Sequence, residues 1–230
     1  KAMRYQLADG PSTAVSDTDT VEKPGKPAAT KTAEDSDNLA KIEKPDPERT
    51  ALFGDSLTYH YAGKLDQAKD LNFKIPGERK NIKFYEPGKS VLTMEKDVKQ
   101  LISEGKLDDV TSAVICGGAN DLMGQSAETI INSLKEMALA LIGKPNKAKV
   151  VLITLPPVRQ HKNFQSKIEE VMDKVTAVNN WIKEFAGKNS EYVSVLDLYG
   201  LAEDPQNPGC MQKKFYNDGL HLSKAGKEIM

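Results

Sequence analysis

The chain has 230 residues, of which 39% are hydrophobic and 28% are charged, with 32 lysines and arginines against 33 aspartates and glutamates. A formal net charge of -1 gives no whole-chain attraction to nucleic acid or to an anionic membrane, so either partner would require a local patch. The apolar run at residues 150–158 is far shorter than the roughly 20 residues that cross a bilayer, which excludes a transmembrane helix there. Two cysteines are too few for a disulfide scaffold. We therefore expect free thiols, with Cys116 in a strand and Cys210 in a loop.

Residues 1–48 differ in composition from the rest of the chain. They hold five of the 12 prolines and few large apolar side chains, so they cannot bury a core. We predict a flexible, charged, proline-rich tail or linker over residues 1–48 and a folded domain over residues 49–230. The first residues carry no apolar signal core, which favours an intracellular protein. Secretion stays an open alternative, because we expect a chain that begins with Lys1 to have been trimmed.

From residue 49 onward, short apolar runs alternate with segments of helical period. The runs predict five strands, at residues 50–53, 82–85, 112–116, 150–155 and 193–198. Amphipathic stripes predict helices over residues 91–102, 130–141 and 168–185, and Ser223 is placed to open a final helix. Strands that alternate with helices are typical of a parallel sheet with crossover helices, so we predict one α/β layer sandwich built on a five-stranded parallel sheet.

The loops that follow the predicted strands carry most of the chemically reactive side chains. In an open parallel sheet, functional residues lie just beyond the carboxyl ends of the strands. Ser56 follows the first strand, Gly88 the second and Asn120 the third. Asp218 and His221 follow the fifth strand. We therefore expect these five residues to meet at one edge of the sheet.

This set of groups is sufficient for acyl transfer. A serine hydroxyl becomes a good nucleophile when a base accepts its proton, and the imidazole of His221 can be such a base for Ser56 at neutral pH. Asp218 precedes His221 by three residues, a spacing at which a tight turn brings its carboxylate to the imidazole Nδ1. The Gly88 N–H, the Asn120 side-chain NH₂ and the Ser56 N–H are candidate donors to the oxyanion of a tetrahedral intermediate.

Four blocks of the sequence together resemble those of the GDSL, or SGNH, hydrolase family. The blocks are Gly54-Asp55-Ser56-Leu57, Gly88, Gly118-Ala119-Asn120-Asp121 and Asp218-Gly219-Leu220-His221. The resemblance covers most of residues 49–230. It implies a flavodoxin-like three-layer α/β/α sandwich that hydrolyses esters without a metal or a cofactor. It also implies that Ser56 is the nucleophile, that His221 is the base and that Asp218 orients it. The oxyanion hole would consist of Ser56, Gly88 and Asn120.

The sequence thus predicts a carboxylic ester hydrolase that acts on short acyl esters, such as acetyl esters, through a serine acyl-enzyme intermediate. Its substrate would be a small ester, with a lipid ester as the second choice. The alternative is a binding or scaffold module in which the same fold contacts protein, RNA or a membrane, since fold alone does not establish activity. The four intact side chains Ser56, Asn120, Asp218 and His221 favour the enzyme.

A second resemblance rests on the arrangement of the chain and not on a motif. A charged, proline-rich segment followed by this domain resembles the esterase domains in first-frame proteins of some LINE-type retrotransposons. That resemblance implies an oligomerising coiled coil upstream of residue 1. It also implies contact with nucleic acid or membrane alongside esterase activity.

Two further groups of residues lie near the predicted edge. A basic cluster follows the fourth strand, and we expect it to be solvated surface. The alternative is that it binds an anionic head group or a phosphate. It consists of Arg159, His161, Lys162 and Lys167. An aromatic group near the first two strand ends forms either part of the core or an apolar wall of the site. It consists of Tyr59, Tyr61, Phe84 and Tyr85.

Overall fold

The central element of the fold is a five-stranded sheet in which every strand is parallel to its neighbours. The computed structural model describes residues 49–58 and 82–229, so the proposed tail at residues 1–48 and the side chains of Tyr59 and Tyr61 lie outside the described residues. The strand order is β2-β1-β3-β4-β5. The strands are β1 (Thr50–Gly54), β2 (Ile82–Tyr85), β3 (Ser112–Cys116), β4 (Lys149–Ile153) and β5 (Val193–Leu196). The predicted α/β fold with a five-stranded parallel sheet is confirmed.

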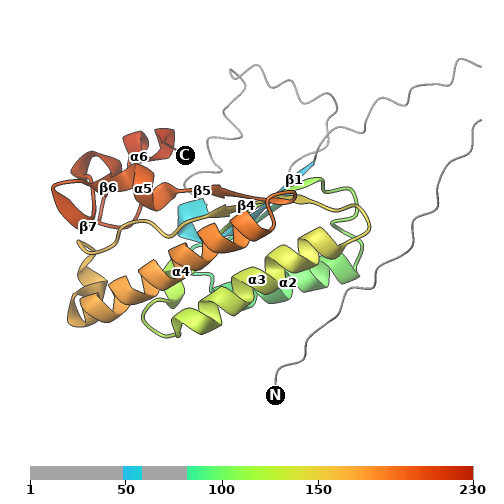
Figure 1. The fold of residues 1–230 in the computed structure, drawn as a ribbon, viewed down its shortest axis with the longest axis horizontal. Coiled ribbons are helices and arrows are strands. Elements are labelled where there is room, and N and C mark those ends of the chain that lie inside the picture. Colours follow the sequence, from blue (N-terminus) through green and yellow to red (C-terminus); the bar gives the residue numbers. More distant parts are fainter. Residues whose placement is uncertain (1–48, 59–81, 230) are drawn as a thin grey trace, which may run out of the picture. The chain divides into compact units, whose positions relative to one another are not determined.

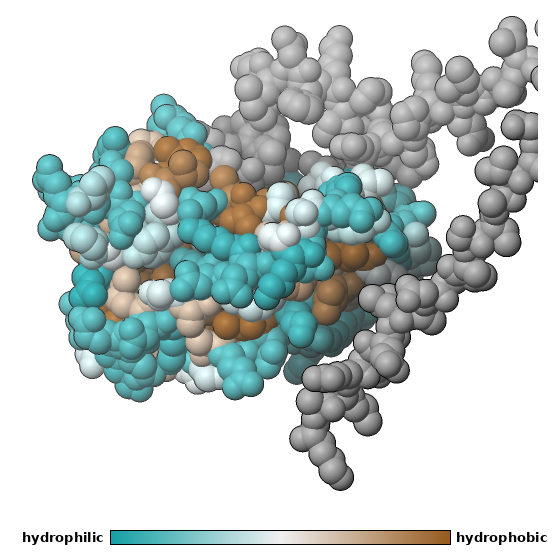
Figure 2. Space-filling model, in the orientation of Figure 1, coloured by the Kyte–Doolittle hydropathy of each residue, from teal (hydrophilic) through white to brown (hydrophobic). Residues whose placement is uncertain are grey.

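Three long helices form a layer on one face of the sheet (Figure 1). They are α2 (Val91–Ser103), α3 (Ala127–Gly143) and α4 (Ile168–Lys188). The first two begin at serine N-caps, where Ser90 Oγ accepts a hydrogen bond from the Thr93 N–H and Ser126 Oγ accepts one from the Thr129 N–H. The outer surface of this layer is largely hydrophilic, with apolar side chains in the grooves between helices (Figure 2). No helix in the described ranges is long and apolar enough to cross a bilayer.

Both faces of the sheet are covered at the interior strand β1. Ala51, Leu52 and Phe53 of β1 are all at most 1% exposed, although successive side chains of a strand point to opposite faces. This double burial explains why the strand reads as a continuous apolar run and not as an alternation. Phe84 of β2 stacks on Phe53 with ring centroids 5.7 Å apart, so it packs against the core.

The C-terminal part of the chain contains structure that the sequence did not indicate. The predicted fifth strand ends early, at Leu196, because Asp197 accepts a hydrogen bond from the Gly200 N–H and caps the short helix α5 (Leu198–Ala202). An antiparallel hairpin of β6 (Glu203–Asp204) and β7 (Asn207–Met211) follows. Cys210 lies in β7 and not in a loop as predicted, while Cys116 lies buried in β3, and both cysteines are free thiols. The chain then reaches α6 (Lys224–Glu228), which Ser223 caps as expected.

Candidate active site

Ser56 begins the helical segment that follows the carboxyl end of β1, with Asp55 between the two elements. A side chain on Gly54 would have no room there, because its Cβ would lie 1.8 Å from Thr58 Oγ1 and 2.6 Å from the Cys116 carbonyl oxygen. Thr58 Oγ1 also donates a hydrogen bond of 3.3 Å to that carbonyl. The chain therefore turns from strand to helix directly against β3, and this close contact fixes the position of Ser56 at the edge of the sheet.

The predicted serine, histidine and aspartate form one continuous chain of hydrogen bonds. Ser56 Oγ lies 2.9 Å from His221 Nε2, although the two residues are 165 positions apart in the sequence. On the other side of the ring, His221 Nδ1 lies 2.6 Å from Asp218 Oδ2. Ser56 is only 9% exposed, so the contact with His221 is partly shielded from water. The structure brings these three groups together in the order that acyl transfer requires.

The surroundings of Asp218 favour its charged form. Partial burial on its own raises the pKa of this carboxyl, but hydrogen bonds from the His221 ring and from backbone N–H groups outweigh it and lower the pKa well below its usual range. The backbone donors are Leu220 N, at 3.1 Å from Oδ1, and His221 N, at 2.9 Å. An ionised carboxylate beside Nδ1 keeps a proton on that nitrogen, so the lone pair of Nε2 faces Ser56.

The two other predicted oxyanion donors, Gly88 and Asn120, lie in the loops that follow β2 and β3, the strands on either side of β1. Asn120 Nδ2 donates a hydrogen bond of 3.2 Å to the Lys89 carbonyl, and the Val91 N–H donates one of 3.0 Å to Asp121 Oδ2. These bonds hold the loop after β3 against the loop after β2, which contains Gly88. A Cβ added to Gly88 would meet no atom within 4 Å, so open space lies beside its backbone. The Asn120 amide has a second N–H available for a ligand.

Asp55 is a buried carboxyl that the sequence reasoning treated only as part of a motif. It is 0% exposed; Oδ1 accepts a hydrogen bond of 2.9 Å from the Leu57 N–H, and Oδ2 has no hydrogen-bond partner. Burial, together with a smaller contribution from the negative charge of Asp121, raises the pKa of Asp55 to about 7 against the lowering effect of the Leu57 bond. Aspartate is almost always exposed unless paired, so nothing in the residue pattern signals this burial.

The predicted basic cluster after β4 divides into two parts, and the expectation of solvated surface is wrong for His161. Its side chain is buried and packs on Phe164, with ring centroids 4.8 Å apart, because the loop turns inward at this point. Burial lowers the pKa of His161, and its Nδ1 has no hydrogen-bond partner. Lys162 and Lys167 are exposed, and Arg159 forms a surface ion pair of 2.7 Å with Glu169.

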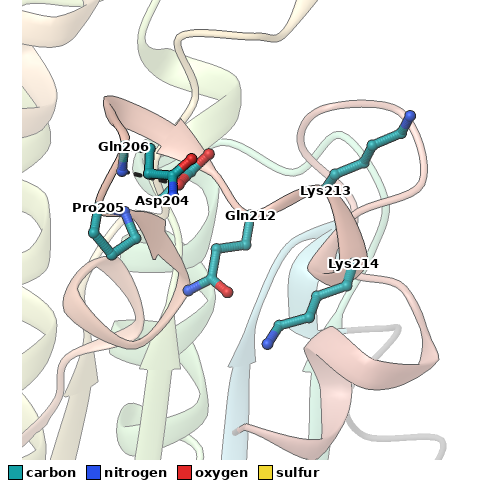
Figure 3. A pocket seen from close by; sticks show the side chains of 6 residues that line it. All are labelled: Asp204, Pro205, Gln206, Gln212, Lys213 and Lys214. Atoms are coloured by element: carbon teal, nitrogen blue, oxygen red, sulfur yellow. Dashed lines mark hydrogen bonds between the residues drawn. The ribbon is translucent and has the colours of Figure 1, made fainter.

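A separate pocket of about 450 Å³ lies beside the β6–β7 hairpin (Figure 3). Its lining is polar and includes two ammonium groups and two carboxamides. The lining residues are Asp204, Pro205, Gln206, Gln212, Lys213 and Lys214. None of the five predicted site residues lines this pocket, so it is distinct from the Ser56 site. Within residues 49–58 and 82–229, no three His, Cys, Asp or Glu side chains come together as a metal site requires.

Comparison with known proteins supports the same class of protein. Residues 52–229 match the GDSL-like Lipase/Acylhydrolase family. The match spans well over half of the chain, and the chain belongs to this family of ester hydrolases. A search of curated proteins returned no significant match.

Solved structures of GDSL proteins share the fold. A GDSL-like lipase from Bacteroides thetaiotaomicron is 18% identical, with a TM-score of 0.64 over 80% of this chain and 84% of that one. The lipase/acylhydrolase from Enterococcus faecalis is 25% identical, with a TM-score of 0.59 over 79% of this chain and 90% of that one. A member of the lipolytic G-D-S-L family from Veillonella parvula is 17% identical, with a TM-score of 0.59 over 79% and 93%.

Proposed function

We propose that the protein is a serine-dependent carboxylic ester hydrolase that cleaves short acyl esters, such as acetyl esters, through an acyl-enzyme intermediate. The observation that carries this proposal is the unbroken series of hydrogen bonds from Ser56 Oγ through His221 to Asp218, at 2.9 Å and 2.6 Å. Such a series supplies a nucleophile, a base for its proton and a carboxylate that orients the base.

In the first half of the reaction, Ser56 Oγ attacks the ester carbonyl carbon while His221 Nε2 accepts the hydroxyl proton. The carbonyl π electrons move to oxygen, and the resulting oxyanion accepts hydrogen bonds from the N–H groups of Ser56 and Gly88 and from Asn120 Nδ2. Loss of one such donor typically costs about 100- to 1,000-fold in rate. The intermediate collapses when the C–O bond to the alcohol breaks and His221 gives its proton to the leaving oxygen.

In the second half, water takes the place of the alcohol. His221 Nε2 accepts a proton from the water as its oxygen attacks the acyl carbon, and a second oxyanion forms at the same donors. The bond from Ser56 Oγ to carbon then breaks, the carboxylic acid leaves, and His221 returns the proton to Ser56. Asp218 stays ionised throughout and stabilises the imidazolium form of His221, in keeping with its lowered pKa.

The preference for short acyl groups is supported by the small number of exposed large apolar side chains among residues 49–58 and 82–229. A long acyl chain needs an extended apolar groove. Among the described residues, the exposed large apolar side chains are Leu92, Met123, Leu139 and Leu201. Leu139 lies on α3 and Leu201 on α5. The other two, Leu92 and Met123, lie next to the loops after β2 and β3, and two side chains are too few to line an extended groove.

The proposal is tested with purified protein, p-nitrophenyl acetate and an organophosphonate label. The wild type hydrolyses the ester and is labelled at Ser56, whereas Ser56→Ala loses both properties because it lacks the hydroxyl that lies 2.9 Å from His221 Nε2. Ser103→Ala, at the exposed end of α2, is the matched control and keeps both. A labelled Ser56→Ala, or a folded wild type without turnover, overturns the proposal. Faster hydrolysis of the octanoate than of the acetate would instead make lipid esters the substrate.

A further inference from the structure

The loop at residues 217–223 carries both Asp218 and His221, so the position of this loop determines the geometry of the site. The loop is closed by a hydrogen bond of 2.9 Å from the Asn217 N–H to the His221 carbonyl. At its tip, Gly219 has a φ of +94°, and a Cβ there would lie 3.1 Å from His161 Cα and 3.2 Å from Gln160 Cγ. The tip of the loop is therefore pressed against residues 160 and 161.

Gln160 joins this tip to a second element through its side-chain amide. Its Nε2 donates a hydrogen bond of 2.8 Å to the Gly219 carbonyl, and its Oε1 accepts one of 3.0 Å from the Met211 N–H. Gly219 directly follows Asp218, and Met211 ends β7. A single half-buried amide thus connects the loop after β4, the hairpin and the loop that holds the predicted base.

The backbone around Gln160 is itself held in place. The His161 N–H donates a hydrogen bond of 2.9 Å to the Val158 carbonyl, and the His161 carbonyl accepts one of 3.1 Å from the Phe164 N–H. The Arg159 N–H donates to the Gly209 carbonyl at 3.0 Å. The buried His161 ring, packed on Phe164, anchors the same turn. Gln160 therefore projects from a rigid support and not from a free loop end.

From this geometry we infer that Gln160 is a positioning residue for hydrolysis, which holds His221 at proton-transfer distance from Ser56. The inference rests on the proposed function of Ser56, His221 and Asp218. Gln160 has no hydrogen bond to any of these three side chains, so it acts through the loop that carries two of them. Misplacement of reacting groups by about 1 Å costs on the order of 100-fold in rate.

The substitution Gln160→Glu tests the inference while keeping the length of the side chain. The introduced carboxylate still accepts from the Met211 N–H but presents an oxygen, instead of a donor, to the Gly219 carbonyl 2.8 Å away. The loop tip is expected to move away from this repulsion. We expect kcat for p-nitrophenyl acetate to fall by about 10-fold or more, with KM changed by less than about twofold, because proton transfer and not substrate binding is disturbed.

A spectroscopic signature reports the same positioning without hydrolysis. The His221 Nδ1 proton, bonded to Asp218 at 2.6 Å, is expected to give a low-field proton resonance that moves or broadens in Gln160→Glu. If this resonance changes while the wild type shows no turnover, the proposed hydrolysis fails but the positioning role of Gln160 stands. If the wild type is active and the variant matches it in kcat and resonance, the positioning role alone is overturned.

Gln100→Glu on α2 is the control. Gln100 is exposed and its amide donates to Glu104 Oε1 at 2.7 Å, so the substitution touches none of the groups that hold the loop at residues 217–223. It is expected to keep kcat and the resonance. If Gln160→Glu does not fold, Gln160→Met keeps the packing but lacks the amide and should show the same loss of kcat. A folded Gln160→Met with kcat within about twofold of the wild type overturns the inference.

Discussion

Two aspartates near the nucleophile have opposite electrostatic surroundings. Asp218 is half exposed and accepts hydrogen bonds from two backbone N–H groups and the His221 ring, which together lower its pKa. Asp55 is fully buried and has one donor for its two oxygens, so burial dominates and its pKa rises to about 7. The first carboxyl is thus suited to pair with an imidazolium, whereas the second is disfavoured as an anion beside Ser56.

The raised pKa of Asp55 predicts a stability that falls as pH rises. The unfolded chain releases this proton near pH ~3.9, whereas the folded chain holds it up to about pH 7. Between these values the folded state binds more protons, so its free energy of unfolding decreases with pH until the folded group has also ionised. Asp55→Asn removes this dependence. Urea unfolding should show the variant gaining about 2 to 3 kcal/mol relative to the wild type between pH 5 and pH 8.

Asp173→Asn is the control for this experiment, because Asp173 is an exposed residue of α4. Its stability relative to the wild type should be nearly the same at both pH values. If the difference in the free energy of unfolding between Asp55→Asn and the wild type is also the same at pH 5 and pH 8, Asp55 is already ionised in the folded protein at pH 5. That result would contradict the expectation from its burial.

At the scale of elements, apolar runs predicted the strands of the sheet but not the hairpin. A run such as Ser112–Cys116 signals a strand covered on both faces. The hairpin at residues 203–211 depends instead on local turn chemistry, since Asp204 accepts from the Gln206 N–H and from Asn207 Nδ2. Its strands show no apolar alternation. The inward turn at His161 was missed for a similar reason, because it lies among charged neighbours in the sequence.

Asn179 on α4 is another contact that periodicity does not reveal. It interrupts the apolar stripe of the helix, yet it is buried and pairs with both backbone groups of Leu155, accepting from N at 2.8 Å and donating to O at 2.9 Å. The pair fixes α4 against the loop after β4. Asn179→Ala leaves two buried backbone groups unpaired, so we expect a loss of about 2 to 4 kcal/mol in urea unfolding.

Asn180→Ala provides the matched comparison for that loss. Asn180 is the next residue of the same helix, has the same side chain and is exposed. Its replacement should change stability by less than about 0.5 kcal/mol. Similar effects of the two substitutions would mean that the Leu155 pairing contributes little to stability.

At the scale of the whole molecule, the site depends on the order of the strands. Because β2 and β3 flank β1, the loops with Gly88 and Asn120 lie on either side of Ser56. The rule that functional residues follow the carboxyl ends of parallel strands predicts this shared edge from the sequence alone. It does not predict the distance of 2.9 Å between Ser56 Oγ and His221 Nε2, because that distance depends on the position of the loop at residues 217–223. The loop is held by the side-chain amide of a single glutamine, Gln160, and such a contact leaves no pattern in the hydropathy or the residue spacing of the sequence.

The division of the chain at residue 49 leads to a last prediction. Arg49 already belongs to the domain, since its side chain pairs with Asp109 at 2.7 Å and its carbonyl accepts from the Thr111 N–H at 3.0 Å. Residues 1–48 lack the apolar content for a core, and we infer that they act as a tail. Deleting residues 1–44 should therefore shift Tm by less than about 2 °C. Deleting residues 1–52 also removes three of the five residues of β1, an interior strand of the sheet, and should abolish cooperative unfolding. A large fall in Tm for the shorter deletion would mean that the tail packs on the domain.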